Sequence, residues 1–229
     1  MNAKPIYLIA GGSPGETRQV TEDFHTALEA CGKPNPKVAY VGTANHDKKM
    51  FFQYMKHPMM KAGAGEVKLV PIANKRTDEA AVKRMLSEAD LVFLSGGEVE
   101  DGMVWLKRYD LDVFLTGLYH SGKPFLGVSA GAIMMGQHWV HWDKEDDDDT
   151  ASLFECLNFV PMLFDTHGES EGWKELKCAL RLLGPGAEGY GLSKGGFFLA
   201  DSSSKLTSFR NGPEVFYNAG GEIRRKDAK

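Results

Sequence analysis

PFLGVSAGAIMM, residues 124–135, joins an apolar segment to a run of small and apolar residues, with one serine at the junction. The residues up to 128 predict a buried strand, and a helix is predicted to begin near residue 130. Gly127 and Gly131 flank Ser129 in the spacing G-x-S-x-G, which is typical of a sharp strand-to-helix turn that exposes a nucleophile. A plain turn in which Ser129 caps the helix would show the same residues. The stretch therefore predicts the end of a strand that carries either a nucleophile or a helix cap.

Apolar strands alternate with segments of helical period on the N-terminal side of this stretch. The predicted strands cover residues 6–10, 37–42, 67–72, 91–95 and 124–128. The predicted helices cover residues 16–31, 47–62, 77–88 and 100–121, the last with a break near Asp110. Short, almost wholly apolar strands separated by helices are typical of a parallel sheet covered on both faces. The pattern predicts a doubly wound, three-layer α/β/α sandwich, with residues 1–229 forming one domain.

The C-terminal part of the chain has a different pattern. A polar and aromatic segment, WVHWDKEDDDDT at residues 139–150, precedes a predicted helix at 169–183. Short strands are predicted over residues 187–217, with turns at 193–196 and 211–213. We expect these strands to extend the sheet in the antiparallel direction at one edge.

Composition and charge exclude several classes of protein. The formal net charge of −4 gives no global attraction to nucleic acid or to an anionic membrane. No apolar run reaches the roughly 18 residues of a transmembrane helix, and the N-terminal residues lack the pattern of a signal peptide. The three cysteines are widely spaced, which favours reduced thiols over disulfides or a zinc site, and the acidic run 145–149 favours a solvated loop over a metal site. The sequence predicts a cytoplasmic protein that binds no metal and no nucleic acid.

A serine nucleophile needs a general base, usually a histidine that a carboxylate orients. His167 follows the apolar run FVPMLFD and precedes the predicted helix at 169–183, so we expect it at the carboxyl edge of the sheet. His120 precedes the strand of Ser129 and is expected at the opposite edge. The other histidines lie in or beside predicted helices or in the segment after Ser129. His167 is the predicted base.

A second glycine-containing strand end, LVFLSGGEVEDGMVWL, covers residues 91–106. Gly96 and Gly97 expose backbone N–H groups there, and the N–H of Ala130 is expected to point into the same space. A phosphate-binding loop is disfavoured because no lysine is present and acidic residues follow the glycines. The earlier cluster GGSPG at 11–15 matches neither of the common glycine-rich nucleotide-binding motifs. The two strand ends together predict an oxyanion-binding site.

Three segments resemble the peptidase E family of serine peptidases, which includes aspartyl dipeptidases and cyanophycinases. GVSAGA at 127–132 is similar to the nucleophile turn of the family, FLSGGEVEDGMVWL at 93–106 to its glycine-rich strand end, and FDTHG at 164–168 to its histidine segment. The resemblance implies the class I glutamine amidotransferase-like fold and hydrolysis of small peptides without a cofactor. It implies that Ser129 is the nucleophile, that His167 is the base, and that the N–H groups of Gly97 and Ala130 bind the oxyanion. The sequence leaves open whether the protein assembles as a homodimer.

The resemblance places the acid of the triad shortly after the turn of Ser129, and Asp143 is our choice among Asp143, Glu145, Asp146 and Asp165. Gly96 and Glu98 are predicted to contact the substrate. Members of the family typically carry asparagine where this chain has Glu98, and a glutamate there would disfavour an acidic side chain on the substrate. The sequence leaves open whether the substrates are Asp-Xaa dipeptides or other short peptides. Two alternatives are a non-catalytic binding domain on the same fold and an amidase or esterase that uses the same residues.

Overall fold

A mostly parallel sheet forms the centre of the structure, a computed structural model that describes residues 3–11, 17–144 and 147–226. Its parallel strands are β1 (Ile6–Ile9), β2 (Lys37–Val41), β3 (Glu66–Val70), β4 (Leu91–Leu94) and β5 (Phe125–Val128). Two antiparallel strands, β10 (Phe197–Ala200) and β11 (Leu206–Arg210), complete one edge. The order across the sheet is β11-β10-β1-β5-β4-β2-β3. All five predicted N-terminal strands are confirmed, as is their parallel arrangement.

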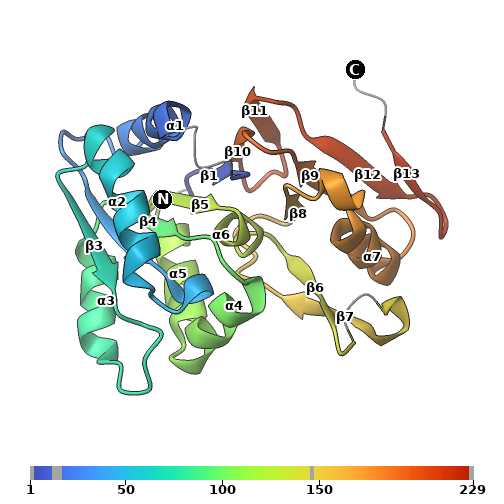
Figure 1. The fold of residues 1–229 in the computed structure, drawn as a ribbon, viewed down its shortest axis with the longest axis horizontal. Coiled ribbons are helices and arrows are strands. Elements are labelled where there is room, and N and C mark those ends of the chain that lie inside the picture. The colour runs from blue at the N-terminus through green and yellow to red at the C-terminus, as the bar shows by residue number, and fades with distance from the viewer. Residues whose placement is uncertain (1–2, 12–16, 145–146, 227–229) are drawn as a thin grey trace.

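Helices cover both faces of this sheet (Figure 1). Two of them, α1 (Thr17–Glu29) and α2 (Lys49–Lys61), lie side by side and pack through Phe24 and Phe52 on one face. The other face is covered by α3 (Glu79–Glu88), α4 (Val99–Arg108), α5 (Leu111–His120) and the short α6 (Ala130–Ile133). The predicted helix over 100–121 is in fact two helices, with Asp110 in a left-handed conformation between them, as its expected break indicated.

The alternation of side chains along β4 shows why the sheet is covered twice. Leu91 and Phe93 belong to the apolar cluster under α1 and α2, whereas Val92 and Leu94 belong to the cluster under α3, α4 and α5. All four side chains are buried. Successive side chains of a strand point to opposite faces, so a wholly apolar strand needs a layer of helices on each side. This confirms the predicted three-layer α/β/α arrangement.

A second sheet follows at the C-terminal side. It consists of β8 (Leu163–Thr166), β9 (Glu188–Leu192), β12 (Glu214–Asn218) and β13 (Ile223–Arg225), in the order β13-β12-β9-β8. The expected antiparallel extension of the first sheet therefore holds for β10 and β11 but not for β9 and β12. The reason is α7 (Lys174–Leu183), which connects the parallel strands β8 and β9 and buries its apolar face against this second sheet.

Two local features differ from the predicted elements. The polar and aromatic segment forms a hairpin of β6 (His138–Trp142) and β7 (Ala151–Glu155), which packs against α7. The helix predicted from 169 begins only at Lys174, because Gly172 and Trp173 adopt left-handed conformations that a helix cannot continue through. None of the helices in the described part of the chain is long and apolar enough to cross a membrane.

Candidate active site

Ser129 occupies a strained turn between β5 and α6. Its φ of 52° and ψ of −123° lie outside the regions that residues other than glycine commonly adopt. The backbone is held there because the Ser129 N–H donates to the Ile9 carbonyl at 3.0 Å. A Cβ at Gly127 would overlap the Gly131 carbonyl, and one at Gly131 would overlap the Leu94 carbonyl, so both positions need glycine. The hydroxyl makes no capping bond to α6, which removes the helix-cap alternative and leaves the side chain directed out of the turn.

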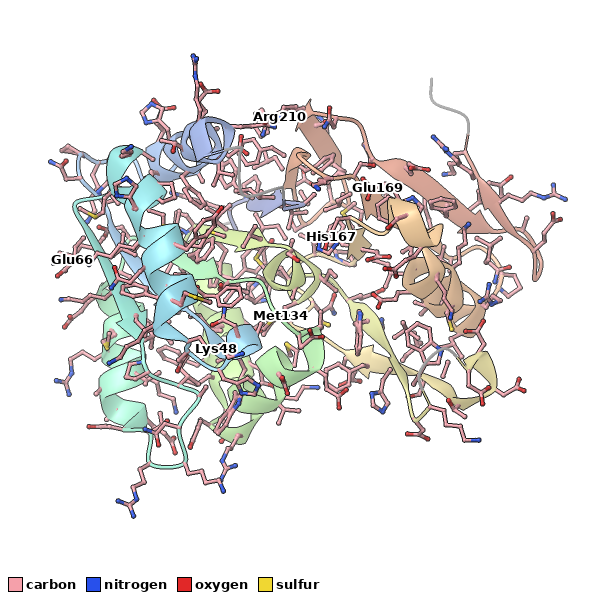
Figure 2. All side chains as sticks on the ribbon, viewed as in Figure 1. Lys48, Glu66, Met134, His167, Glu169 and Arg210 are labelled. Atoms are coloured by element: carbon pink, nitrogen blue, oxygen red, sulfur yellow. The ribbon has the colours of Figure 1, made fainter. Side chains whose placement is uncertain are left out.

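His167 meets this hydroxyl from the second sheet. His167 follows β8, and its backbone N–H donates to the Leu192 carbonyl of β9 at 3.0 Å. Its Nε2 lies 2.8 Å from the Oγ of Ser129, a hydrogen-bond distance. Figure 2 shows His167 between α6 and the strands of the second sheet. The two side chains that are 38 residues apart in the sequence are therefore in contact. A nucleophile in contact with a base is the arrangement that general-base activation of serine requires.

The glycine-rich turn after β4 lies directly beside Ser129. A Cβ at Gly96 would be 3.2 Å from the Ser129 Cβ, so the backbone of Gly96 is in close contact with Ser129. Gly97 has φ of 145°, and a Cβ there would overlap the carbonyl of Ala44. Ala130 is the first residue of α6, so its N–H has no acceptor within the helix. Gly97 thus lines the same cavity as Ser129, and Ala130 follows Ser129 directly in the chain, so the two residues lie at neighbouring strand ends.

A buried polar network holds the peptide between Gly96 and Gly97. The Asn45 Nδ2 donates to the Gly96 carbonyl at 2.8 Å and to the Ser95 Oγ at 2.9 Å, and the Tyr40 hydroxyl is 2.6 Å from the same Oγ. In a trans peptide the C=O and the following N–H point in opposite directions. Fixing the Gly96 carbonyl on the Asn45 side therefore directs the Gly97 N–H away from Asn45.

Asp143 lies away from His167. It follows β6, its side chain is 82% exposed, and its Oδ1 is 3.5 Å from the Nε2 of His141. The Nδ1 of His141 is in turn 2.8 Å from a carboxylate oxygen of Glu100. The β6–β7 hairpin leads away from the first sheet (Figure 1), which is why a residue close to Ser129 in sequence ends up beside another imidazole. The structure thus does not bring together the expected acid and the expected base.

Asp165 is a buried carboxylate of this region, and Glu175 is a half-buried one. Asp165 accepts the backbone N–H of Thr166 at 2.7 Å, and burial raises the pKa of its carboxyl to about 7. Burial also raises the pKa of Glu175, which accepts a hydrogen bond from the Trp139 indole at 3.2 Å, while positive charge on His167 acts in the opposite direction. Glu145 and Asp146 lie outside the described residues. Within the described ranges, no hydrogen bond or ion pair joins a carboxylate to His167.

A cavity of about 410 Å³ opens in front of Ser129 and His167. Its floor is formed by the strand ends, including Gly96 and Gly97, and its walls are formed by α1 and α2. The volume falls in the range of about 300–1,000 Å³ that is typical of small-molecule sites. Glu98 directly precedes α4 as its N-cap residue, is exposed, and is not one of the cavity residues. The residues predicted to react therefore face a space large enough for a small substrate, and Gly96 but not Glu98 lines it.

The sequence matches a family model described as peptidase family S51 over residues 6–195. The chain belongs to peptidase family S51. It is 22% identical over 216 residues to an uncharacterised peptidase, YgaJ, of Bacillus subtilis (strain 168), covering 92% of this chain and 90% of that protein. The predicted membership in the peptidase E-like serine peptidases is thereby confirmed.

The fold of this S51 peptidase is shared with solved structures of low sequence identity. A crystal structure of a peptidase from an acI-B1 actinobacterium superposes with a TM-score of 0.73 at 16% identity, covering 99% of this chain and 95% of that one. A Listeria monocytogenes EGD-e protein that is provisionally assigned to peptidase E superposes with a TM-score of 0.66 at 18% identity, covering 92% and 100%. These likenesses support the α/β architecture described above.

Sequence reasoning about this S51 peptidase missed two residues of the site region. Asn45 lies in the 3₁₀ turn Thr43–Asn45 that follows β2, and it is 4% exposed. Glu175 lies in the first turn of α7. A polar residue directly after a buried parallel strand was the available signal for Asn45, because strand ends of one sheet meet at one edge. No local signal identifies Glu175. In the described part of the chain, no group of three or more His, Cys, Asp or Glu side chains could hold a metal ion.

Proposed function

We propose that the chain hydrolyses short peptides through an acyl-enzyme on Ser129. The observation that carries the proposal is the 2.8 Å contact between the Ser129 Oγ and the His167 Nε2 at a strained strand-to-helix turn. Strain at a turn is retained where the surrounding structure over-determines it, and such positions cluster at active sites. Peptidase membership is shown by the family match, and the contact supports a role for these two side chains in the reaction.

In this mechanism the Oγ of Ser129 attacks the scissile carbonyl carbon while its proton moves to the Nε2 of His167. The N–H groups of Gly97 and Ala130 donate to the oxygen of the tetrahedral intermediate. The C–N bond then breaks, and His167 returns the proton to the leaving amine. Water then attacks the resulting ester while His167 accepts a proton from the water; the C–Oγ bond breaks, the acid product leaves, and His167 returns the proton to the Oγ of Ser129.

The cavity supports a substrate of dipeptide size or the end of a short peptide. The space in front of Ser129 has about 410 Å³, and helices bound it on two sides. A long folded polypeptide would have to displace α1 or α2 to place its backbone at the Oγ. We propose Glu175 as the acid component in place of Asp143, because Glu175 is half-buried in the first turn of α7 and positive charge on His167 favours its ionised form, whereas Asp143 contacts His141. Glu175 would act through space, stabilising the imidazolium that forms during the attack.

A serine-directed fluorophosphonate tests the proposal. We expect one covalent adduct on Ser129 of the parent protein by peptide mass spectrometry, and loss of both the adduct and peptide hydrolysis in Ser129→Ala. His167→Ala should slow labelling strongly, because the hydroxyl loses its base. Ser121→Ala, a change in the exposed turn after α5, is the matched control and should label like the parent. An adduct that persists in Ser129→Ala would move the nucleophile elsewhere and overturn the proposal.

A further inference from the structure

The walls of the cavity in front of Ser129 are mostly apolar. Val20 of α1 and Met55 and Pro58 of α2 belong to these walls, and Ile9 and Val128 contribute from the strand ends. Phe51 and Tyr54 complete the apolar part of the α2 side, and Gln53 and His57 are its polar members. The part of a substrate that enters between α1 and α2 therefore meets aliphatic and aromatic groups, while its reacting carbonyl lies at the polar floor.

No lysine, arginine, aspartate or glutamate lines the cavity among the described residues. Residues 12–16, which fall outside the described ranges, read GSPGE and supply no lysine or arginine. The cations next to the cavity residues in sequence are already engaged: Lys56 lies over the Phe52 ring at 5.4 Å, and Arg18 pairs with Glu22 at 3.0 Å. A substrate carboxylate in this space would lose water and gain no lysine or arginine partner from the described lining, which is an unfavourable exchange.

Exposed apolar side chains mark the mouth of the same cavity. Phe51 is 38% exposed and Tyr54 is 54% exposed, and both lie on α2. Adjacent exposed aromatic groups at the entrance to a cavity are typical of a binding surface. Glu98, which by sequence was expected to repel acidic substrates, lies outside the cavity residues. An acidic substrate side chain in the cavity would therefore meet the side chains of α1 and α2 rather than Glu98.

We propose that the acyl residue of the substrate, the residue whose carbonyl Ser129 attacks, carries an uncharged apolar or aromatic side chain such as Leu, Met or Phe. That side chain enters between α1 and α2, and Val20, Tyr54 and Met55 determine the specificity. The inference rests on the proposed peptidase reaction at Ser129. The sequence leaves open whether the substrates are Asp-Xaa dipeptides or other short peptides. The inference favours short peptides with an apolar acyl residue over Asp-Xaa dipeptides.

The test is a panel of dipeptides that share one leaving residue and differ in the acyl residue, Phe, Leu, Met or Asp, each with a free and with an acetylated amine. We expect kcat/KM for the best apolar member to exceed that for the Asp member by about 100-fold or more, since burying an unpaired charge costs several kcal/mol. Tyr54→Arg, which adds a cation at the cavity mouth, should lower that ratio by about 10-fold or more. Val113→Arg is the matched control, because Val113 is 70% exposed on the distant α5.

The outcomes separate the inference from the proposed function. Fluorophosphonate labelling of Ser129 together with a preference for the Asp member would overturn the inference and leave the peptidase reaction intact. An unchanged ratio in Tyr54→Arg, confirmed with Val20→Arg as a second variant inside the cavity, would show that these walls do not determine specificity. No label on Ser129 and no hydrolysis of any member would overturn both.

Discussion

Asp165→Asn provides a quantitative test of the buried carboxylate beneath the turn of His167. Burial raises the pKa of the Asp165 carboxyl from 3.8 to about 7, and its side chain is 6% exposed in the fold. Because the folded-state pKa lies above the unfolded-state pKa, the folded protein binds the proton more tightly. Stability from this group is therefore fully present below about pH 4 and is lost as the pH rises through about 7.

The magnitude follows from the two pKa values. At pH 5 the unfolded carboxyl is ionised and the folded carboxyl is protonated, whereas at pH 9 both are ionised. At about 1.4 kcal/mol per pH unit, the contribution lost between pH 5 and pH 9 is about 3 kcal/mol. The asparagine does not titrate and keeps an oxygen that accepts the Thr166 N–H. The free energy of unfolding of Asp165→Asn should therefore lack this pH-dependent contribution.

The assay is urea unfolding of both proteins at pH 5, 6, 7, 8 and 9, followed by far-UV circular dichroism. The free energy of unfolding of Asp165→Asn, relative to that of the parent, should rise by about 3 kcal/mol from pH 5 to pH 9, with half of the change complete near pH 6 and most of it by about pH 7. Asp143→Asn, at an 82% exposed carboxylate, is the matched control and should show a difference that barely depends on pH. A constant difference for Asp165→Asn across this range would refute the reasoning.

Three further predictions concern the reaction. Asn45→Ala should lower kcat by about 10- to 100-fold with little change in KM, because the Gly96 carbonyl loses its donor and the oxyanion N–H that follows it is no longer directed; equal loss in KM instead would indicate a role in ground-state binding. Gly97→Ala should lower kcat by about 100-fold or more while far-UV circular dichroism stays native-like, because its φ of 145° and the Ala44 carbonyl leave no room for a Cβ. Glu175→Gln should lower kcat/KM by about 10-fold, equivalent to about 1.4 kcal/mol of imidazolium stabilisation, whereas Asp143→Asn should retain the parent value within about 3-fold. A larger loss of kcat/KM in Asp143→Asn than in Glu175→Gln would instead identify Asp143, which follows β6, as the acid of the triad.

The sequence determined the local elements because their signals are local. Buried strands such as 91–95 are continuous apolar runs, and the glycine spacing around Ser129 reports a backbone that admits no Cβ. Such patterns depend on residues within a few positions of one another, and so the parallel sheet, its helices and the sharp turn could all be predicted. The position of His167 could be predicted because it follows an apolar, strand-like segment, and the carboxyl ends of parallel strands meet at one edge of the sheet.

Only the tertiary structure decided which side chains meet. The partition of the C-terminal strands into two sheets follows from where α7 buries its apolar face, and this brings His167 of the second sheet to Ser129 of the first. The position of Asp143 follows from the direction of a hairpin, and the apolar walls of the cavity come from α1 and α2, which precede Ser129 by many residues. Contacts between distant segments depend on chain topology and packing, and no periodicity in the sequence reports them. The predicted nucleophile was therefore visible in one short stretch, whereas the groups around it and the walls of its cavity required the fold.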